Sequence, residues 1–205
     1  MVRKLLFPLL ILVSFALAGC SGYGEVEQGR TVAFDKAAGT VTIIKDNGID
    51  DKHPQYTVLP PHTFQLPTDK AEIGAEPDVG LRVNLDAKNN IITMYNPKTQ
   101  EFDKLSFEMV QKEENVSVRR QHPLVYDAAT RQARHFPVVD SEKKTVTIYS
   151  VRQMLYTVIK LSDADFEKYG PEDWAAGDDV RIYYKEPGKA LRFMNVSKTD
   201  LTRRK

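Results

Sequence analysis

Four carboxylates flank the only tryptophan of the chain, and carboxylate pairs can catalyse the hydrolysis of a glycosidic bond. Glu172, Asp173, Asp178 and Asp179 surround Trp174. Glycosidases use two carboxyl groups, one as an acid and one as a base or nucleophile. The same residues also suit a solvated connector in which the indole covers the core of a β unit, and we adopt this second interpretation. We therefore expect no catalytic residue, and a small carboxylate-dependent glycan hydrolase is the alternative function.

The four histidines are the other side chains with an obvious chemistry, the binding of a metal ion. They are His53, His62, His122 and His135, and all lie near prolines or arginines in predicted loops. Structural zinc sites place ligands at helical or hairpin spacing. The pairs His53–His62 and His122–His135 do not have this spacing. Segment 46–51 likewise lacks the alternating oxygen ligands and the final glutamate of a calcium loop. We expect neither a metal nor a cofactor, and a metal-binding sensor is a further alternative.

Aromatic side chains on predicted strands suggest a surface for binding. Tyr149, Tyr156 and Tyr183 lie in alternating segments of the C-terminal half, and with Trp174 they form a candidate ligand face. Aromatic strand faces of small barrels can bind glycans or peptides. The alternation predicts that Tyr183 faces outward and Tyr184 inward. Core packing accounts for some of these rings in the same way.

The N-terminal segment has the layout of an export signal that ends at a cysteine. Arg3 and Lys4 precede an apolar run, Leu5–Leu17, which is too short to span a bilayer as a helix. The residues Leu17-Ala18-Gly19-Cys20 resemble the lipobox of bacterial lipoproteins. That resemblance implies cleavage before Cys20 and acyl chains on its sulfur, so Cys20 is the predicted lipidation site.

Cys20 is also the only cysteine of the chain, so we expect neither an intramolecular disulfide nor thiol catalysis. In the lipoproteins that the lipobox resembles, the residue after the cysteine directs sorting, and Ser21 favours the outer membrane. We therefore expect a lipid-anchored outer-membrane protein that faces the periplasm. Its first partner is the membrane, through the Cys20 anchor.

The charge balance argues against a nucleic-acid partner. The chain has 29 basic and 28 acidic residues, and removal of residues 1–19 takes away Arg3 and Lys4 and no acid, which leaves 27 minus 28, or −1. Nucleic-acid binding needs clustered positive charge. The mature length, 205 minus 19 or 186 residues, suffices for one large domain or two small ones.

An internal repeat organises the mature chain. Phe34-Asp35 and, after four spacers, Thr40–Ile43 recur as Val139-Asp140 and Thr145–Ile148 at an offset of 105 residues. In each copy an aspartate opens the turn between two apolar segments, and aspartate favours turn starts because its side chain accepts bonds from nearby amides. Each copy is therefore predicted to begin with a β-hairpin.

Two later matches extend each copy to five strands. Tyr56–Val58 matches Tyr156–Val158 and is the predicted third strand. Leu81–Leu85 then matches Val180–Tyr184, as the start of a closing hairpin. Five strands suggest a small OB-like or SH3-like barrel, and Ser162 can cap a short helix in the second copy. The predicted fold class is mainly β, with internally duplicated five-stranded barrels.

The matches also set the predicted domain organisation. It consists of a signal peptide 1–19, a lipidated tether 20–29, a first β repeat 30–96, a connector with extra strands 97–134, a second β repeat 135–200 and a basic tail 201–205. Whether the repeats form two separate barrels or one fused sheet stays open at this point.

Three further features of the mature chain are the segment Val26-Glu27-Gln28-Gly29-Arg30, residues 56–61, and the C-terminal pair 181–185 and 191–195. Together they resemble an uncharacterised family of bacterial lipoproteins that is known only as a domain of unknown function. The resemblance covers nearly the whole mature chain and implies no activity, cofactor or catalytic residue. We therefore expect a non-enzymatic binding or structural module of the cell envelope, whose partner is an envelope protein or a cell-wall glycan.

Overall fold

The computed structural model describes residues 23–48 and 54–199, and the regular structure in these ranges is mainly β. The elements in chain order are β1 (Glu25–Asp35), β2 (Thr40–Lys45), β3 (His62–Gln65), η1 (Lys70–Glu72), β4 (Arg82–Asp86), β5 (Ile91–Asn96), β6 (Glu101–Ser106), β7 (Glu108–Glu113), β8 (Tyr126–Asp127), β9 (Gln132–Ala133), β10 (Val138–Asp140), β11 (Thr145–Ser150), β12 (Leu155–Lys160), α2 (Asp163–Glu167), η2 (Pro171–Trp174), β13 (Asp179–Glu186) and β14 (Lys189–Asn195). The prediction that the fold is mainly β is therefore confirmed.

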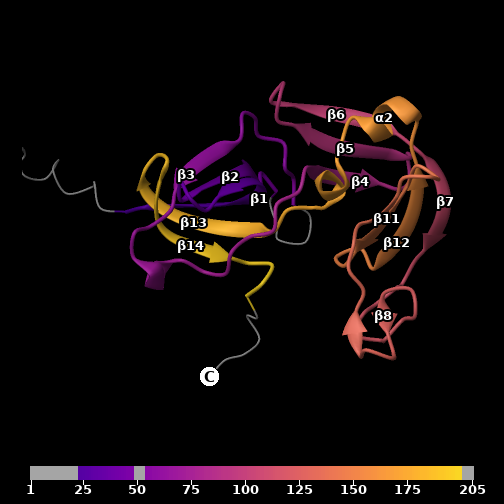
Figure 1. Ribbon diagram of the computed structural model, residues 1–205. Helices are drawn as coiled ribbons and strands as arrows, with labels where there is room; N and C mark the ends of the chain where they lie inside the picture. The colour runs from indigo at the N-terminus through magenta and orange to yellow at the C-terminus, as the bar shows by residue number, and fades with distance from the viewer. Residues whose placement is uncertain (1–22, 49–53, 200–205) are drawn as a thin grey trace, which may run out of the picture.

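Five strands close into a barrel in the order β1-β13-β14-β3-β2 (Figure 1). All neighbours are antiparallel except β14 and β3, which meet in parallel at Lys189 and Gln65. The strands alternate as expected for one buried face, and the inward side chains fill the barrel. These include Val41, Ile43, Phe64, Val180, Ile182 and Phe193. Closure pairs the strand edges that an open sheet would expose.

The remaining long strands form two sheets joined by a bent segment. One sheet has the order β4-β5-β6 and the other β10-β11-β12-β7. Only Phe107 separates β6 from β7, so one stretch of chain runs from the first sheet into the second. The Phe107 side chain is buried in the core at this bend. Within residues 23–48 and 54–199, only β1, β2, β3, β13 and β14 close into a barrel. The predicted second barrel is therefore not shown.

The opening hairpin of each predicted repeat is confirmed. β1 pairs with β2 and β10 with β11, through the matched Thr-Val-Thr-Ile segments. Oδ1 of Asp35 accepts hydrogen bonds from the amides two and three residues later, both at 2.9 Å, and Oδ1 of Asp140 does the same at 3.1 and 3.0 Å. The same aspartate chemistry therefore builds both turns.

The predicted third strand of the first copy is wrong. Tyr56 makes only an isolated bridge with Asp46, and the strand that pairs with β2 is β3. The Tyr56 side chain is drawn away from the barrel because its ring lies under the Arg30 guanidinium and packs in the other core. In the second copy, Tyr156–Val158 does lie in the third strand, β12, as predicted.

The two closing hairpins have exchanged places relative to the prediction. The hairpin β13–β14, expected with the second repeat, pairs with β1 and β3 in the barrel, whereas β4–β5, expected with the first, pairs with β6. Alternation indicates which face of a strand is buried, but it does not identify the neighbouring strand. The barrel therefore combines strands from both ends of the described chain.

The two connectors that lead into these hairpins cross at very close range. The backbone N–H of Asp178 donates to the carbonyl oxygen of Asp78 at 2.9 Å. A Cβ atom at Gly177 would lie 1.8 Å from a carbonyl oxygen of β1, and one at Gly80 would lie 2.1 Å from that of Ala175. Both distances are far inside van der Waals contact. Only glycine lets the backbones approach this closely.

A large core fills the space between the barrel and the other sheets. It contains Trp174, which has 0% of its surface exposed, together with Ile92, Met94 and Ile148. Val32 and Ile44, from barrel strands, belong to the same core. The two sets of strands therefore pack as one body, as the adjoining ribbons in Figure 1 show.

The short helix expected in the second repeat is present as α2. Ser162 is its N-cap, and the Ser162 Oγ accepts a hydrogen bond from the Asp165 amide at 3.2 Å. Phe166 on this helix packs against the large core. Among the described residues, the structure contains no helix with the length and apolar character needed to cross a bilayer.

Candidate functional site

Three aromatic rings form a platform on the outer face of the four-stranded sheet. Tyr149 on β11 and Tyr156 on β12 are directly opposite each other, on the face away from the buried Ile148 and Thr157. Phe136, just before β10, packs on both, with ring centroids 5.7 Å from Tyr149 and 6.0 Å from Tyr156. These tilted and edge-on arrangements are favourable for aromatic pairs. We call this set the aromatic platform.

A groove of about 630 Å³ opens beside the platform. Phe136, Tyr156, Val138 and Thr147 line it from the sheet, and the β8–β9 segment lines it from the other side. This volume lies within the usual range of small-ligand pockets, about 300–1,000 Å³. The groove can therefore hold a ligand of a few rings.

Polar groups line the β8–β9 side of the groove. They come from Asp127, Thr130, Gln132, Arg134 and His135. Hydrogen bonds from the amides of Ala129 and Thr130 lower the pKa of the Asp127 carboxyl below its ordinary value, so Asp127 is ionised at neutral pH. The groove thus offers a carboxylate acceptor, guanidinium and amide donors, and an apolar platform.

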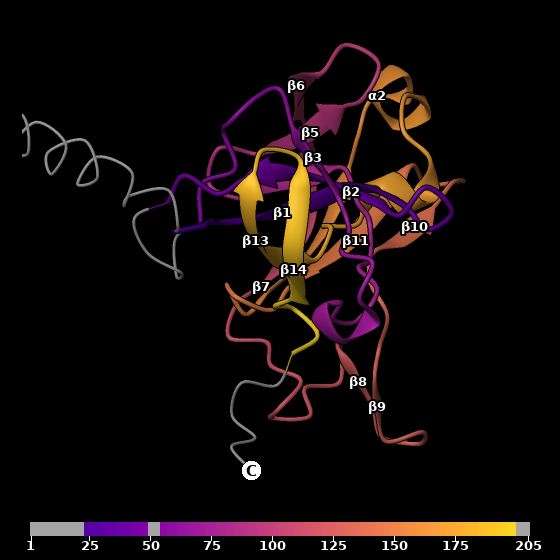
Figure 2. The same ribbon diagram turned by 90° about the vertical axis from the view of Figure 1, so that its left-hand side faces the viewer.

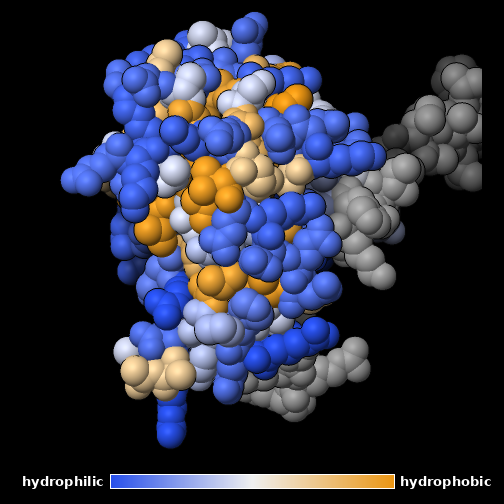
Figure 3. Space-filling model, turned by 90° about the vertical axis from the view of Figure 1, so that its right-hand side faces the viewer, coloured by the Kyte–Doolittle hydropathy of each residue, from blue (hydrophilic) through white to orange (hydrophobic). Residues whose placement is uncertain are grey.

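Apolar side chains also reach the surface around this sheet. The right-hand side of the molecule in Figure 1, near β7 and β12, has apolar patches separated by hydrophilic side chains (Figure 3). The exposed large apolar residues of these strands and their connections are Val110, Val138, Val151 and Met154. Of these, Val138 lines the groove. Isolated apolar patches of this kind are normal on soluble surfaces, so the groove is distinguished by its shape and its rings.

A family model described as a domain of unknown function (DUF4881) matches residues 22–204. The chain belongs to the DUF4881 family. The match spans the barrel and all the other described sheets, and it confirms the expected membership of a family without an assigned function. No curated protein and no solved structure matches the chain. The groove of this DUF4881 chain is therefore interpreted from its own side chains.

The four residues of the candidate ligand face lie in three different places. Tyr149 and Tyr156 share the platform, whereas Trp174 is completely buried and packs against Tyr169 and Phe166, with ring centroids at 5.5 and 6.3 Å. Trp174 is thus a core residue, as the connector interpretation expects. Tyr183 lies on the barrel strand β13 and lines a separate groove.

Phe136 is a platform residue that the sequence reasoning missed. It lies next to Pro137 and outside the regular alternation, so periodicity gives no reason to select it. The one sequence signal that could have selected Phe136 is its position just before the β10–β11 hairpin, whose sequence repeats that of β1–β2. Its position over Tyr149 and Tyr156 depends on the fold of the segment between β9 and β10.

Asp173 and Asp178, two of the four carboxylates near Trp174 in the sequence, are engaged in the scaffold. Oδ2 of Asp173 accepts a hydrogen bond from the Gly170 amide at 2.7 Å, at the start of η2. Oδ2 of Asp178 accepts from the Asp78 amide at 2.9 Å and from the Asn195 side chain at 2.8 Å. These contacts hold the connectors of the DUF4881 fold together.

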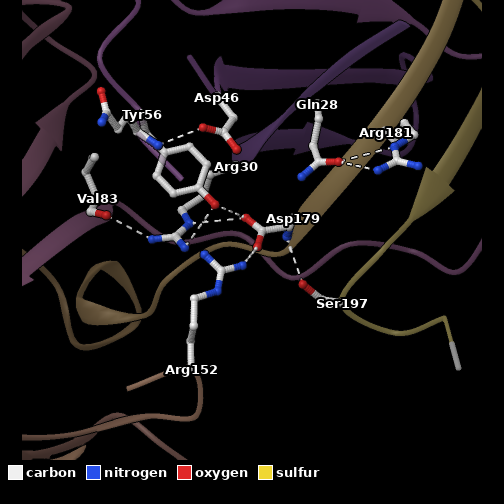
Figure 4. A network of polar contacts seen from close by, with 10 residues as sticks. Gln28, Arg30, Asp46, Tyr56, Val83, Arg152, Asp179, Arg181 and Ser197 are labelled. Atoms are coloured by element: carbon white, nitrogen blue, oxygen red, sulfur yellow. Dashed lines mark hydrogen bonds and ion pairs between the residues drawn. The ribbon is translucent and has the colours of Figure 1, made fainter. Parts of the chain in front are cut away.

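Asp179 is part of a polar network between the barrel and the other sheets (Figure 4). Its carboxylate accepts hydrogen bonds from the Tyr56 hydroxyl and, at 3.0 Å, from Arg152, and it lies 3.6 Å from Nε of Arg30. Arg30 also donates to the carbonyl oxygen of Val83 on β4 at 2.9 Å. Burial raises the pKa of Tyr56, so its hydroxyl stays protonated and donates. The network therefore joins β1 and β13 of the barrel to β4 and to the β11–β12 turn.

Arg82 adds a further, half-buried cation near Arg30 of this network. Its Nε donates to the carbonyl oxygen of Trp174 at 3.0 Å. Burial, together with the positive charge of Arg30, lowers the pKa of Arg82 to about 9. The group therefore remains charged at neutral pH, and its hydrogen bond holds η2 against β4.

The histidines are dispersed. Nδ1 of His62 lies 2.7 Å from Oε1 of Glu27, Nδ1 of His122 accepts from the Leu124 amide at 3.3 Å, and His135 lines the aromatic groove. Within the part of the chain that the structure describes, no group of three or more metal-binding side chains gathers. His53, residues 49–51, the lipobox with Cys20 and the tail 201–205 lie outside the described residues.

Proposed function

We propose that this DUF4881 chain is a lipid-anchored module of the outer membrane that faces the periplasm and binds a cell-wall glycan in its aromatic groove. The lipobox supports the anchor, because Cys20 follows the residues at which lipoproteins are cleaved. The observation that carries the binding function is the platform of Phe136, Tyr149 and Tyr156 beside the groove.

The chemistry of the groove suits a sugar chain. A pyranose ring has an apolar face that stacks on aromatic rings and a rim of hydroxyl groups that both donate and accept hydrogen bonds. The platform supplies the stacking surface, while Asp127 accepts and Gln132 and Arg134 donate. Ligand sites in proteins commonly combine an apolar lining with a few polar groups that fix the orientation.

The binding test uses the mature protein and purified peptidoglycan glycan strands, with Kd as the readout. Tyr156→Ala should weaken binding about thirtyfold, because truncation of a central aromatic anchor commonly costs about 2 kcal/mol or more. Ala133→Trp, on the exposed strand β9, should weaken it similarly by filling the groove while the platform stays intact. Tyr23→Ala is the matched control, since Tyr23 is 98% exposed and lies outside the groove.

Two results would contradict the glycan proposal. One is a Kd for glycan strands that neither Tyr156→Ala nor Ala133→Trp changes. The other is saturable binding of the peptide stems in place of the glycan strands, which would make the groove a peptide site. Unfolding curves of each variant separate a lost binding site from a lost fold.

A further inference from the structure

A second groove lies on the outer face of the barrel, on strands β1, β13 and β14. It has a volume of about 620 Å³ and an apolar floor formed by Val26, Tyr183, Leu191 and Met194. Val26 is 61% exposed and Leu191 45%, although both are aliphatic. The outward direction of Tyr183 is the one that the strand alternation predicts. We call this surface the barrel groove.

The chain enters the fold directly over this groove. Val26 pairs with Tyr183 across the β1–β13 ladder. A Cβ atom at Gly24 would lie 2.4 Å from the Tyr183 ring, so the backbone before β1 rests on that ring. Glycine permits this close approach. The described chain therefore enters β1 at the edge of the groove.

The sequence separation between the anchor and the groove is short. Cys20 precedes Val26 by six residues, which span at most about 21 Å when fully extended. Acyl chains on Cys20 would therefore keep the start of β1 near the lipid headgroups. Figure 2, seen from the left-hand side of Figure 1, has β13 and β14, two strands of the barrel groove, in the foreground.

The charged residues of the barrel groove favour an anionic surface. Arg192 is paired with Glu72, at 2.5 Å between Nε and Oε2, whereas Arg181 donates to the neutral side-chain oxygen of Gln28 at 2.7 Å. Two arginines and one glutamate leave the lining with a charge of +1. Arginine near an anionic membrane surface is attracted to its phosphates.

We infer that the barrel groove is a membrane-docking surface that lies against the anionic lipid headgroups of the leaflet holding the Cys20 anchor. This inference rests on the proposed lipid anchor and adds an orientation to it. Val26 and Leu191 enter the interface, Tyr183 lies at headgroup level, and Arg181 contacts phosphate. The β8–β9 segment, which lines the aromatic groove, lies on the other side of the molecule from β13 and β14 (Figure 1).

The test reconstitutes the acylated mature protein in vesicles of phosphatidylethanolamine and phosphatidylglycerol. Because the Cys20 sulfur is acylated in this form, Leu191→Cys introduces the only free thiol, which is labelled with an environment-sensitive fluorophore. Glu142→Cys, in the exposed β10–β11 turn, is the matched control. Docking on the vesicles should blue-shift the label at position 191, and nitroxide headgroup lipids should quench it. Neither change should occur for the label at position 142.

A charge variant tests the role of the arginine. In the Leu191→Cys protein, Arg181→Gln should shift the docked-to-undocked ratio about fivefold toward undocked, the effect of one basic residue at an anionic surface. Replacement of phosphatidylglycerol by neutral phosphatidylcholine should act in the same direction.

Equal quenching at positions 191 and 142 in acylated protein would overturn the docking surface. Protection of position 191 in native envelopes but not in lipid vesicles would also overturn it, and would indicate a protein partner on the barrel groove. Mass spectrometry of the starting material separates these outcomes from failure of the anchor, since a chain without acyl groups on Cys20 contradicts the proposed function itself.

Discussion

Asp78 and Asp178 hydrogen-bond each other twice across a separation of 100 residues. The amide of Asp178 donates to the carbonyl oxygen of Asp78, and the amide of Asp78 donates to Oδ2 of Asp178, both at 2.9 Å. The two residues join the connectors that lead into the closing hairpins, at the point where these connectors cross. The barrel can therefore close only after both ends of the described chain have met, and such non-local contacts slow folding.

The crossing predicts a sharp difference between two glycines. Gly177→Ala should destabilise the protein by about 2 kcal/mol or more, because its Cβ would overlap a backbone oxygen of β1 that no side-chain movement can clear. Gly170→Ala is the control, since its Cβ would meet nothing closer than 3.4 Å. Urea unfolding of both variants measures the difference. Equal midpoints would show that the connectors can separate without cost.

The Asp179 network predicts a large effect of removing one charge. Asp179→Asn leaves Arg30 and Arg152 without their shared carboxylate, and this should cost about 3 kcal/mol of unfolding free energy, as for other largely buried ion pairs that lose one partner. Asp163→Asn breaks only a surface pair with Lys144 and should change stability by less than about 1 kcal/mol. A similar small change in both variants would mean that water replaces the lost carboxylate.

Asp103 predicts a loss of stability in acid. Burial alone would raise the pKa of this carboxyl, but the ion pair with Lys168 and the hydrogen bonds from Tyr169 and Asn96 outweigh it, so the pKa lies below its ordinary value. A lowered pKa in the folded state gives stability that is present above the unfolded-state pKa and is lost as the pH falls through the folded-state value.

The variant Asp103→Asn checks this linkage. It keeps an acceptor for Tyr169 but loses the ion pair, so it should be less stable than the natural protein at pH 7, by about 1 kcal/mol. The difference should shrink toward zero below pH 4, about the pKa of an unfolded aspartate. A difference that stays constant from pH 7 into acid would exclude the linkage. Chemical unfolding over this pH range is the measurement.

The buried position of Trp174 predicts fluorescence emission at short wavelength that external quenchers reach poorly. It is the only tryptophan and is fully buried, and its Nε1 has no hydrogen-bond partner among the described residues. Acrylamide should quench it poorly, and glycan strands that bind the aromatic groove should leave its emission unchanged. Trp174→Ala should cost about 3–5 kcal/mol. Efficient quenching of the folded protein would contradict this core position.

The lipobox predicts a change of cell fraction. Cys20→Ser removes the thiol that acylation requires, so the protein should lose its acyl mass and leave the membrane fraction. Tyr23→Ala, three residues later, is the control and should remain at the membrane. Membrane retention of Cys20→Ser without acyl groups would contradict the anchor and leave the glycan test unaffected.

Local patterns were sufficient to predict the two opening hairpins and the core position of Trp174. Asp35 and Asp140 open turns because their side chains reach the next amides, an interaction that lies within a few residues of sequence. The alternation likewise placed Tyr183 outward. The prediction of a third strand at Tyr56 was wrong because Arg30, a residue distant in sequence, holds the Tyr56 ring in the large core outside the barrel.

The sequence by itself determined the mainly β class, the two opening hairpins, the short helix and the membership of a family of unknown function. Only the tertiary structure decided that β13–β14 closes the barrel with β1 and β3, and that Phe136 joins Tyr149 and Tyr156 in one platform. The physical reason is range: turn chemistry and strand alternation act between near neighbours, whereas the choice between similar strand partners depends on how the connectors cross at Gly80 and Gly177.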